Sequence, residues 1–321
     1  MGIEACRRTT NDTVDLNAPT VGFRQSSVSY RHVMRDDVRE VLREHLPGYD
    51  VRAVRPCGAG TDNVAFDVNG DLIVRFRRAD PAGVDREARL LAVVAHVSPF
   101  PVPEPLLVDA DRGVLAYRRL PGVPMPEVTT PVDPVALGEQ LGDLLTALHA
   151  VPPHRVADLV ETDDTPPGDW LVEADGNWPT VAAYVPAVHR AAVDEFLAAP
   201  PPAAAPTLVF SHADLGIEHV LVDPATGSVR GIIDWADAAV GDPAYDMGLI
   251  LRDLGPGALD AALGAVALGA DALGADAALR DRAGFYARCG LLADLAYGME
   301  TGRRWYADKS LVAMRWLFAA G

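Results

Sequence analysis

The chain has 321 residues, 49% of them hydrophobic, which is enough to bury one large core or two modest ones. Its formal net charge of −17 disfavours a nucleic-acid backbone as a partner and is compatible with a cationic substrate. No segment approaches the ~20 consecutive apolar residues of a membrane span, and the three scattered cysteines match neither a metal motif nor an even set of disulfides. These features predict a cytoplasmic protein without a nucleic-acid or membrane partner.

The N-terminal part of the chain predicts a tail, a helix and a β-hairpin. Residues 1–33 are polar and lack a sustained period, so we expect a flexible tail. A helix is expected over residues 36–46, whose apolar side chains recur on one face. Residues 63–68 and 72–76 have the pattern of strands, and the Asn69-Gly70 pair between them favours a type I′ hairpin turn.

A glycine-containing segment precedes this hairpin. Gly58, Gly60 and Thr61 are expected to lie in a bend, where glycines let backbone N–H groups approach phosphate oxygens. An ordinary turn is the alternative, because glycines alone carry little specificity. After the hairpin a helix is expected over residues 84–95.

The remainder of the chain is expected to be mainly helical. Short strands are expected over residues 106–108 and 114–117, and a helix with a leucine-rich face over residues 135–149. From Pro256 to the end the sequence contains only helix signals.

Three short apolar segments in the second half of the chain are expected to be strands. Residues 208–210 run into a polar loop, and residues 219–222 and 229–233 flank a turn-forming sequence. The second and third segments should therefore pair as an antiparallel hairpin.

Four polar residues converge at the ends of these segments. The loop after the first strand presents His212 and Asp214, and the hairpin would bring His219 and Asp234 together at its open end. Such a group suits phosphoryl transfer, in which one carboxylate accepts the proton of an attacking hydroxyl and others hold the magnesium that neutralises nucleotide phosphates. Asp214 is the expected base and Asp234 the expected main metal ligand; loop residues joined by chance are the alternative.

The same residues form a recognisable series of motifs. The series is His-x-Asp, a ligand five residues past that Asp, then Ile-Ile-Asp-Trp and Gly-Asp-Pro-x-x-Asp. It resembles the aminoglycoside phosphotransferase family, kinases with a protein-kinase-like fold. The family usually has Asn where this chain has His219, and a His there is similar to the macrolide-phosphorylating branch. The resemblance implies that His219, in its neutral form, is a second metal ligand; a packed structural histidine is the alternative.

Further roles follow from the resemblance. His212, counted with Asp214 in the catalytic set, and Asp242 are expected to brace the loop, and Asp246 is expected to cap a helix. In the first half of the chain Arg75 is similar to the strand residue with which kinases grip nucleotide phosphates, and Glu87 is its expected partner.

The nucleotide and substrate sites are also implied by the family. Gly58, Gly60 and Thr61 would lie over the triphosphate, and backbone groups of Tyr117 and Arg119 would bond the base. The segment 161–178 mixes carboxylates with tryptophans where the family builds its substrate surface, although a solvated loop with two anchoring tryptophans is the alternative. The expected substrate residues are Trp170, Trp178, Asp237 and Glu300.

The sequence therefore predicts an α+β, two-lobed kinase-like fold. Residues 34–117 are expected to form a nucleotide-binding N-lobe with an antiparallel sheet, and residues 118–321 a mainly helical C-lobe. The expected reaction transfers the terminal phosphoryl group of ATP or GTP, with Mg²⁺, to a hydroxyl of an amine-bearing antibiotic. Macrolides are favoured, and aminoglycosides or basic peptide antibiotics come next. The alternatives are a metabolic kinase for an amino alcohol or sugar, and a catalytically dead kinase-like binding module. No oligomeric state is predicted.

Overall fold

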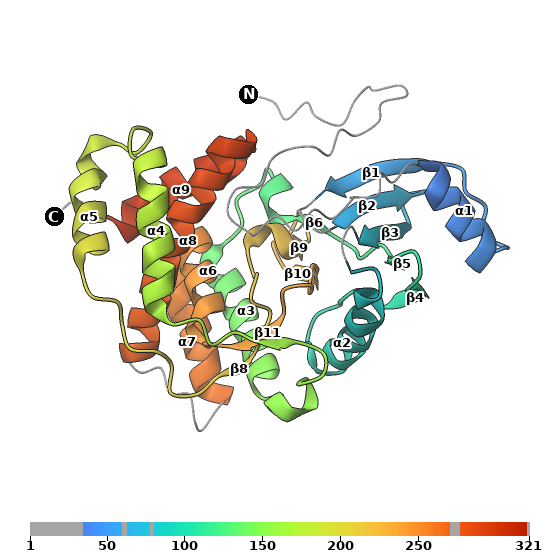
Figure 1. Cartoon of the computed structure of the whole chain (residues 1–321), viewed down its shortest axis with the longest axis horizontal. Helices are drawn as coiled ribbons and strands as arrows, with labels where there is room; N and C mark the ends of the chain where they lie inside the picture. Colours follow the sequence, from blue (N-terminus) through green and yellow to red (C-terminus); the bar gives the residue numbers. More distant parts are fainter. Residues whose placement is uncertain (1–34, 60–62, 78–79, 270–276, 320–321) are drawn as a thin grey trace. The chain divides into compact units, whose positions relative to one another are not determined.

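The computed structural model describes residues 35–59, 63–77, 80–269 and 277–319 (Figure 1). The chain divides into two compact units. The N-terminal unit comprises the described residues up to Val84 together with Leu106–Arg119, and the C-terminal unit comprises Asp85–Pro105 and the described residues from Leu120 onward. The expected tail over residues 1–33 lies outside the described residues.

A five-stranded sheet forms the N-terminal unit. Its order is β1-β2-β3-β5-β4, and the pairs β1–β2, β2–β3 and β3–β5 are antiparallel. The strands are β1 (Val54–Ala59), β2 (Asn63–Val68), β3 (Leu72–Arg77), β4 (Pro105–Asp109) and β5 (Val114–Arg118). The expected bend from residue 56 onward is instead strand up to Ala59. A bulge between Pro56 and Gly58 accommodates a proline that cannot donate to the ladder.

One hydrophobic core holds this unit together. The helix α1 (Arg35–His45) contributes Val38 and its apolar neighbours, which pack with the inward side chains of the sheet. Two of these, Phe66 and Phe76, meet edge to face with ring centroids 6.2 Å apart. The predicted type I′ turn is confirmed, because Asn69 and Gly70 have φ of 59° and 86°.

Helices make up most of the C-terminal unit. They are α2 (Gly83–Val97), α3 (Pro134–His149), α4 (Pro167–Val181), α5 (Ala187–Ala198), α6 (Ala244–Leu254), α7 (Pro256–Gly269), α8 (Ala277–Thr301) and α9 (Arg304–Leu317). The helices predicted after Pro256 are thus confirmed. No helix in the described ranges is long and apolar enough to cross a membrane.

Two small sheets complete the C-terminal unit. One has the order β10-β9-β6 and the other β7-β11-β8. Their strands are β6 (Val123–Pro124), β7 (Glu161–Thr162), β8 (Val209–Ser211), β9 (Val220–Val222), β10 (Val229–Ile232) and β11 (Ala239–Gly241). The predicted β9–β10 hairpin is antiparallel as expected, with Gly227 in its turn at φ 73°.

The acidic and aromatic segment 161–178 differs from a simple loop. It supplies β7 and then most of α4, which begins at Pro167. Proline is favourable in the first turn of a helix, because that turn's N–H groups lack intrahelical acceptors in any case. Trp170 and Trp178 therefore lie on a helix, whereas Asp163 and Asp164 lie in the short connection before it.

Backbone-level packing joins α3 to α7. A Cβ atom built on Gly138 would lie 2.3 Å from the carbonyl oxygen of Ala258, and one on Gly142 would lie 2.6 Å from that of Ala262. Only glycine permits so close an approach. This contact joins a helix that precedes the predicted catalytic segment in the chain to one that follows it.

Candidate functional site

The candidate catalytic loop comprises residues 212–219. It leaves β8, contains Asp214, and ends in the short 3-10 helix η3 (Ile217–His219) before β9. Ala213 in the loop and Asp234 after β10 have φ of 60° and 64°, a left-handed conformation that residues with a side chain rarely adopt. Such strain persists where surrounding contacts impose it.

The Asp246 carboxylate holds the loop from behind. It is fully buried in α6, and its Oδ2 accepts the backbone N–H of His212 at 3.0 Å and of Ala213 at 3.1 Å. Its Oδ1 accepts the N–H of Leu215 at 3.3 Å. Burial raises the pKa of Asp246 to about 6, although these three N–H groups favour the ionised form. Asp246 is therefore a brace of the loop and not the helix cap that we expected.

The capping role belongs to Asp242 instead. Its Oδ1 accepts the backbone N–H of Ala244 at 2.8 Å, in the first turn of α6. Its Oδ2 accepts hydrogen bonds from Arg282 Nε at 2.9 Å and from the Tyr286 hydroxyl at 3.2 Å. The expected roles of the two aspartates thus differ from the observed ones, because Asp242 lies two residues before α6 and bonds its first N–H group, whereas Asp246 lies within the first turn of the helix.

His212 is a buried support of the loop. Its ring is fully buried and lies 4.5 Å from the Trp235 ring, centroid to centroid. The Asp214 N–H lies 3.3 Å from Nδ1, and Nε2 lies 3.1 Å from the Ile233 carbonyl oxygen. A carbonyl only accepts, so the proton is on Nε2. Burial, and then the charge of His219, lower the pKa of His212 to about 3, so His212 joins the loop to the Asp234 segment as a neutral imidazole.

His219 lies between the two candidate carboxylates. Its Nδ1 is 2.7 Å from the Asp214 carbonyl oxygen, which places the ring proton on that nitrogen, and its Nε2 is 3.6 Å from Asp234 Oδ2. The hairpin thus brings His219 and Asp234 together as predicted. Burial works against the charged imidazole, but the carboxylates of Asp214, Asp234 and Glu218 outweigh it and raise the pKa of His219.

Asp214 has the most perturbed carboxylate of the site. Removal from water is the main cause, and the charges of Glu218, Asp237 and Asp234 add to it, so that its pKa rises to about 8; the imidazole of His219 acts in the opposite direction. The side chain nevertheless keeps 42% of its surface exposed. In its ionised form, such a carboxylate is a stronger base than an ordinary aspartate, and enough of it is ionised near neutral pH to accept a proton.

A divalent cation has two candidate protein donors here, Asp234 Oδ2 and His219 Nε2. Within the described ranges no three His, Cys, Asp or Glu side chains are grouped as a preformed metal cage. A magnesium ion bound together with a nucleotide needs only one or two carboxylates, because phosphate oxygens and water supply its other ligands. The half-exposed Asp234 side chain fits such an ion, whereas an imidazole nitrogen is a poorer ligand for a hard cation.

The predicted nucleotide residues fall in both units. Arg75 is buried on β3 in the N-terminal unit, and Glu87 is buried on α2 in the C-terminal unit. Gly58 lies in β1, and Gly60 and Thr61 are outside the described residues.

The residues predicted to bond the nucleotide base lie in β5 and directly after it. Tyr117 is buried in that strand. The backbone N–H of Arg119 donates to the Asp71 carbonyl oxygen at 2.9 Å, and its guanidinium pairs with Asp67 at 2.7 Å. The Arg119 N–H is therefore already used, which leaves its carbonyl as the backbone group that could bond a base.

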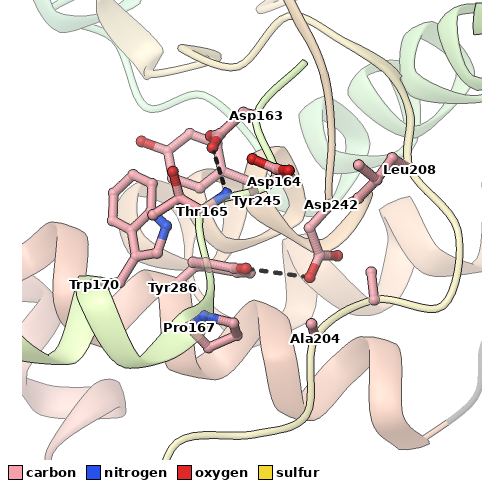
Figure 2. Close-up of a pocket in the computed structure, with 11 residues that line it drawn as sticks. Asp163, Asp164, Thr165, Pro167, Trp170, Ala204, Leu208, Asp242, Tyr245 and Tyr286 are labelled. Atoms are coloured by element: carbon pink, nitrogen blue, oxygen red, sulfur yellow. Dashed lines mark hydrogen bonds between the residues drawn. The ribbon is translucent and has the colours of Figure 1, made fainter.

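An acidic and aromatic pocket lies within the C-terminal unit (Figure 2). It encloses about 160 Å³. Trp170 of α4 lies 5.1 Å from Tyr245 and 5.8 Å from Tyr286, ring centroid to ring centroid, so three rings form one wall. The carboxylates that line the pocket are those of Asp163, Asp164 and Asp242. Burial, and then the charge of Asp214, raise the pKa of the Tyr245 phenol, which indicates that the pocket lies near the candidate base.

Of the four predicted substrate residues, the structure places Trp170 in this pocket. Trp178 is on the same helix, but its indole N–H donates to Asp194 at 2.8 Å and anchors α4 to α5. Asp237 is exposed in the loop after Asp234, where its charge raises the pKa of Asp214. Glu300 is exposed near the end of α8.

Two aromatic residues of the pocket were not predicted, Tyr245 and Tyr286. Tyr245 is the variable residue before Asp246 in the Gly-Asp-Pro-x-x-Asp motif, so its position next to the catalytic segment was visible in the sequence. Tyr286 gives no such signal, because nothing local indicates that α8 passes Asp242.

The arrangement is typical of a small-molecule kinase. It combines a buried support for a loop aspartate, a hairpin that carries a second carboxylate, and an adjoining acidic pocket. Comparison with known proteins agrees. The phosphotransferase enzyme family matches residues 53–285, and the chain belongs to that family. It is a phosphotransferase enzyme.

Individual relatives are more distant. The viomycin phosphotransferase of Streptomyces vinaceus is 27% identical over 225 residues, which cover 66% of this chain and 77% of the relative. Among solved structures, the GDP complex of aminoglycoside 2'-phosphotransferase-IIIa has a TM-score of 0.66 at 19% identity, covering 87% of this chain and 96% of that one. Macrolide 2'-phosphotransferase MphH from Brachybacterium faecium has a TM-score of 0.59 at 24% identity and covers 87% and 98%. The predicted kinase-like fold is thus confirmed.

Proposed function

We propose that this enzyme transfers the terminal phosphoryl group of ATP or GTP to a hydroxyl of an amine-bearing antibiotic. The observation that carries the proposal is the exposed Asp214, with its raised pKa, beside His219 and Asp234 at the open end of the hairpin. Phosphoryl transfer to an alcohol requires a base for the hydroxyl and a carboxylate that holds the metal, and these two carboxylates lie on either side of His219.

Each polar group of the site has a role in the proposed reaction. Asp214 orients the acceptor hydroxyl and takes its proton, while Asp246 and His212 keep the loop in its strained conformation. Asp234, with His219 as the second candidate ligand, would hold Mg²⁺, which neutralises phosphate charge. A cation bound there would also lower the pKa of Asp214 and favour its basic form.

The nucleotide is proposed to contact the N-terminal unit. Arg75 would supply a fixed charge for the phosphates, and Gly58 would let the backbone approach them. A buried guanidinium offers two parallel donors to a phosphate, where a lysine would offer one compact charge. The aminoglycoside 2'-phosphotransferase-IIIa structure is a GDP complex, which supports a nucleotide donor for this chain.

The acceptor is proposed to place a cationic group in the acidic and aromatic pocket. Carboxylates attract an ammonium or guanidinium group, and the rings of Trp170, Tyr245 and Tyr286 cover its apolar surroundings. The names of the relatives cover viomycin, kanamycin and macrolides. We favour a macrolide, because the pocket combines rings with carboxylates and His219 occupies the usual Asn position, and place aminoglycosides and basic peptide antibiotics next.

A direct assay tests the function. Purified enzyme is incubated with Mg²⁺, ATP or GTP, and one acceptor at a time, and the acceptor is analysed by mass spectrometry for one added phosphoryl group. The panel contains a macrolide, kanamycin, viomycin, an amino alcohol and a sugar, with Asp214→Ala as the inactive control. Phosphorylation of the amino alcohol or sugar alone would establish a metabolic kinase instead. Nucleotide binding without any transfer would establish a binding module.

A further inference from the structure

Lys309 occupies an unusual position behind the candidate catalytic loop. It is the only lysine of the chain, lies on α9, and is 11% exposed. Its Nζ is 3.0 Å from Asp294 Oδ2, 3.2 Å from Asp253 Oδ2 and 3.5 Å from Glu218 Oε2. One ammonium group thus joins α9 to α8, to α6 and to η3.

Two cations serve the three carboxylates of this cluster. Arg252 Nε is 2.7 Å from Asp253 Oδ1, and its NH1 is 3.1 Å from Asp294 Oδ2, so a second cation serves these two carboxylates. Glu218 has Lys309 as its ion-pair partner among the described residues. Without Lys309, a poorly solvated Glu218 carboxylate would lose that partner while remaining close enough to Asp214 to affect its pKa.

Two contacts connect this cluster of ion pairs to the loop backbone. Asp253 Oδ2, which pairs with Lys309, also accepts the backbone N–H of Ile217 at 3.2 Å. The Glu218 carboxylate folds back against the loop so closely that a Cβ on Gly216 would lie 2.4 Å from its Oε2. The Glu218 carboxylate therefore packs directly on the loop backbone between Asp214 and His219.

Aromatic rings keep the ammonium group in place. Lys309 Nζ lies 5.0 Å from the centroid of the Trp305 ring and 5.2 Å from that of the Tyr306 ring. Rings at these distances attract a cation and limit its access to water, so the electrostatic attraction between Lys309 and its partners is less screened than at an open surface.

We propose that Lys309 is a positioning residue, which acts through Glu218 to hold the loop segment between Asp214 and His219 in its reactive conformation. The proposal rests on the proposed function for the role of Asp214. Lys309 touches neither substrate nor nucleotide in this scheme. Its effect is to couple α9, the last helix of the chain, to the geometry of the candidate base.

Four variants test the coupling. Lys309→Met removes the charge, Lys309→Arg keeps it, and Glu218→Gln combined with Lys309→Met removes both members of the pair. Arg280→Met is the matched control, because it removes a cation from α8 whose partner, Asp260, is exposed. Turnover is measured per folded enzyme, with folded protein determined by near-UV circular dichroism, and KM for the nucleotide is measured in parallel.

We expect Lys309→Met to lower kcat on the order of tenfold to a hundredfold, since a small displacement of a reacting group has effects of that size, with KM for the nucleotide unchanged. Lys309→Arg should retain most of the activity. The double variant should recover about tenfold over Lys309→Met, within the range of coupling between contacting residues. Arg280→Met should match the wild type. Unchanged kcat in Lys309→Met, or a double variant no better than the single one, would overturn the proposal.

Amide hydrogen exchange tests the positioning role of Lys309 independently of the proposed function. Lys309→Met should speed exchange at Ile217 and Leu215, and the double variant and Arg280→Met should do so less. This readout needs no substrate, so it stands even if no acceptor is phosphorylated. Equal protection of both amides in wild type and Lys309→Met would contradict the positioning role. Should Lys309→Met not fold, Lys309→Arg and Glu218→Gln give the same comparison with smaller changes.

Discussion

Replacement of Asp246 should weaken the whole C-terminal unit by an amount that follows from its three hydrogen bonds. In Asp246→Ala, the N–H groups of His212, Ala213 and Leu215 lose their acceptor in a fully buried place. Each buried N–H without an acceptor costs about 1–3 kcal/mol, and relief from burying the carboxylate offsets part of the sum. We therefore expect a net loss of about 4 kcal/mol, within the range for removing one side of a buried charged network.

Asp246→Asn supplies the graded comparison. Its single amide oxygen can still serve His212 and Ala213, but its NH₂ group would face the N–H of Leu215, so that one bond is lost and the expected cost is about 1–3 kcal/mol. Urea unfolding followed by tryptophan fluorescence measures both variants, and the Ala variant should shift the midpoint by roughly 1–2 M. Equal midpoints for wild type and Asp246→Ala, or equal losses for Ala and Asn, would refute the count of bonds as the cause.

Three further predictions concern the site and its pocket. The pKa of about 8 for Asp214 lies above its ordinary value, so kcat/KM should rise with pH up to about 8. The free energy of unfolding should fall as pH rises toward 8, because the unfolded state ionises this carboxyl more readily than the folded state does. Asp214→Asn should be inactive, and its melting temperature should exceed that of the wild type at pH 8 but not at pH 4. His219→Asn should stay active, but because imidazolium lowers the pKa of Asp214 its kcat/KM should plateau at a higher pH; an unchanged profile would show that His219 carries no charge there. Trp170→Ala should raise KM for the acceptor and not for the nucleotide, whereas Trp178→Ala should lower the melting temperature alone; the opposite assignment would place the acceptor elsewhere.

The architecture could be predicted well because its signals are local. The Asn69-Gly70 turn, the leucine face of α3 and the β9–β10 hairpin each depend on residues that are neighbours in the chain. The helix α4 was missed, because its mixture of prolines, glycines and charged residues has weak intrinsic helix preference. Its packing against α8 supplies what the local sequence does not.

The chemistry of the site could be predicted only in part. That His219 lies close to Asp214 and Asp234 could be predicted from their spacing along one short stretch of chain. The brace formed by Asp246 was not, since a carboxylate after a helix start suits a cap and a long-range acceptor equally well, and only the fold decides between them. Trp170 and Trp178 were indistinguishable in sequence, because the partner that occupies Trp178, Asp194, belongs to another helix.

The single lysine also has a practical consequence for covalent labelling. Apart from the α-amino group, Lys309 carries the only primary amine of the chain, and that amine is ion-paired and 11% exposed. Acylating reagents should therefore modify this side chain only slowly while the protein is folded. The rate at which Lys309 becomes acylated would then measure how often the helices around it open.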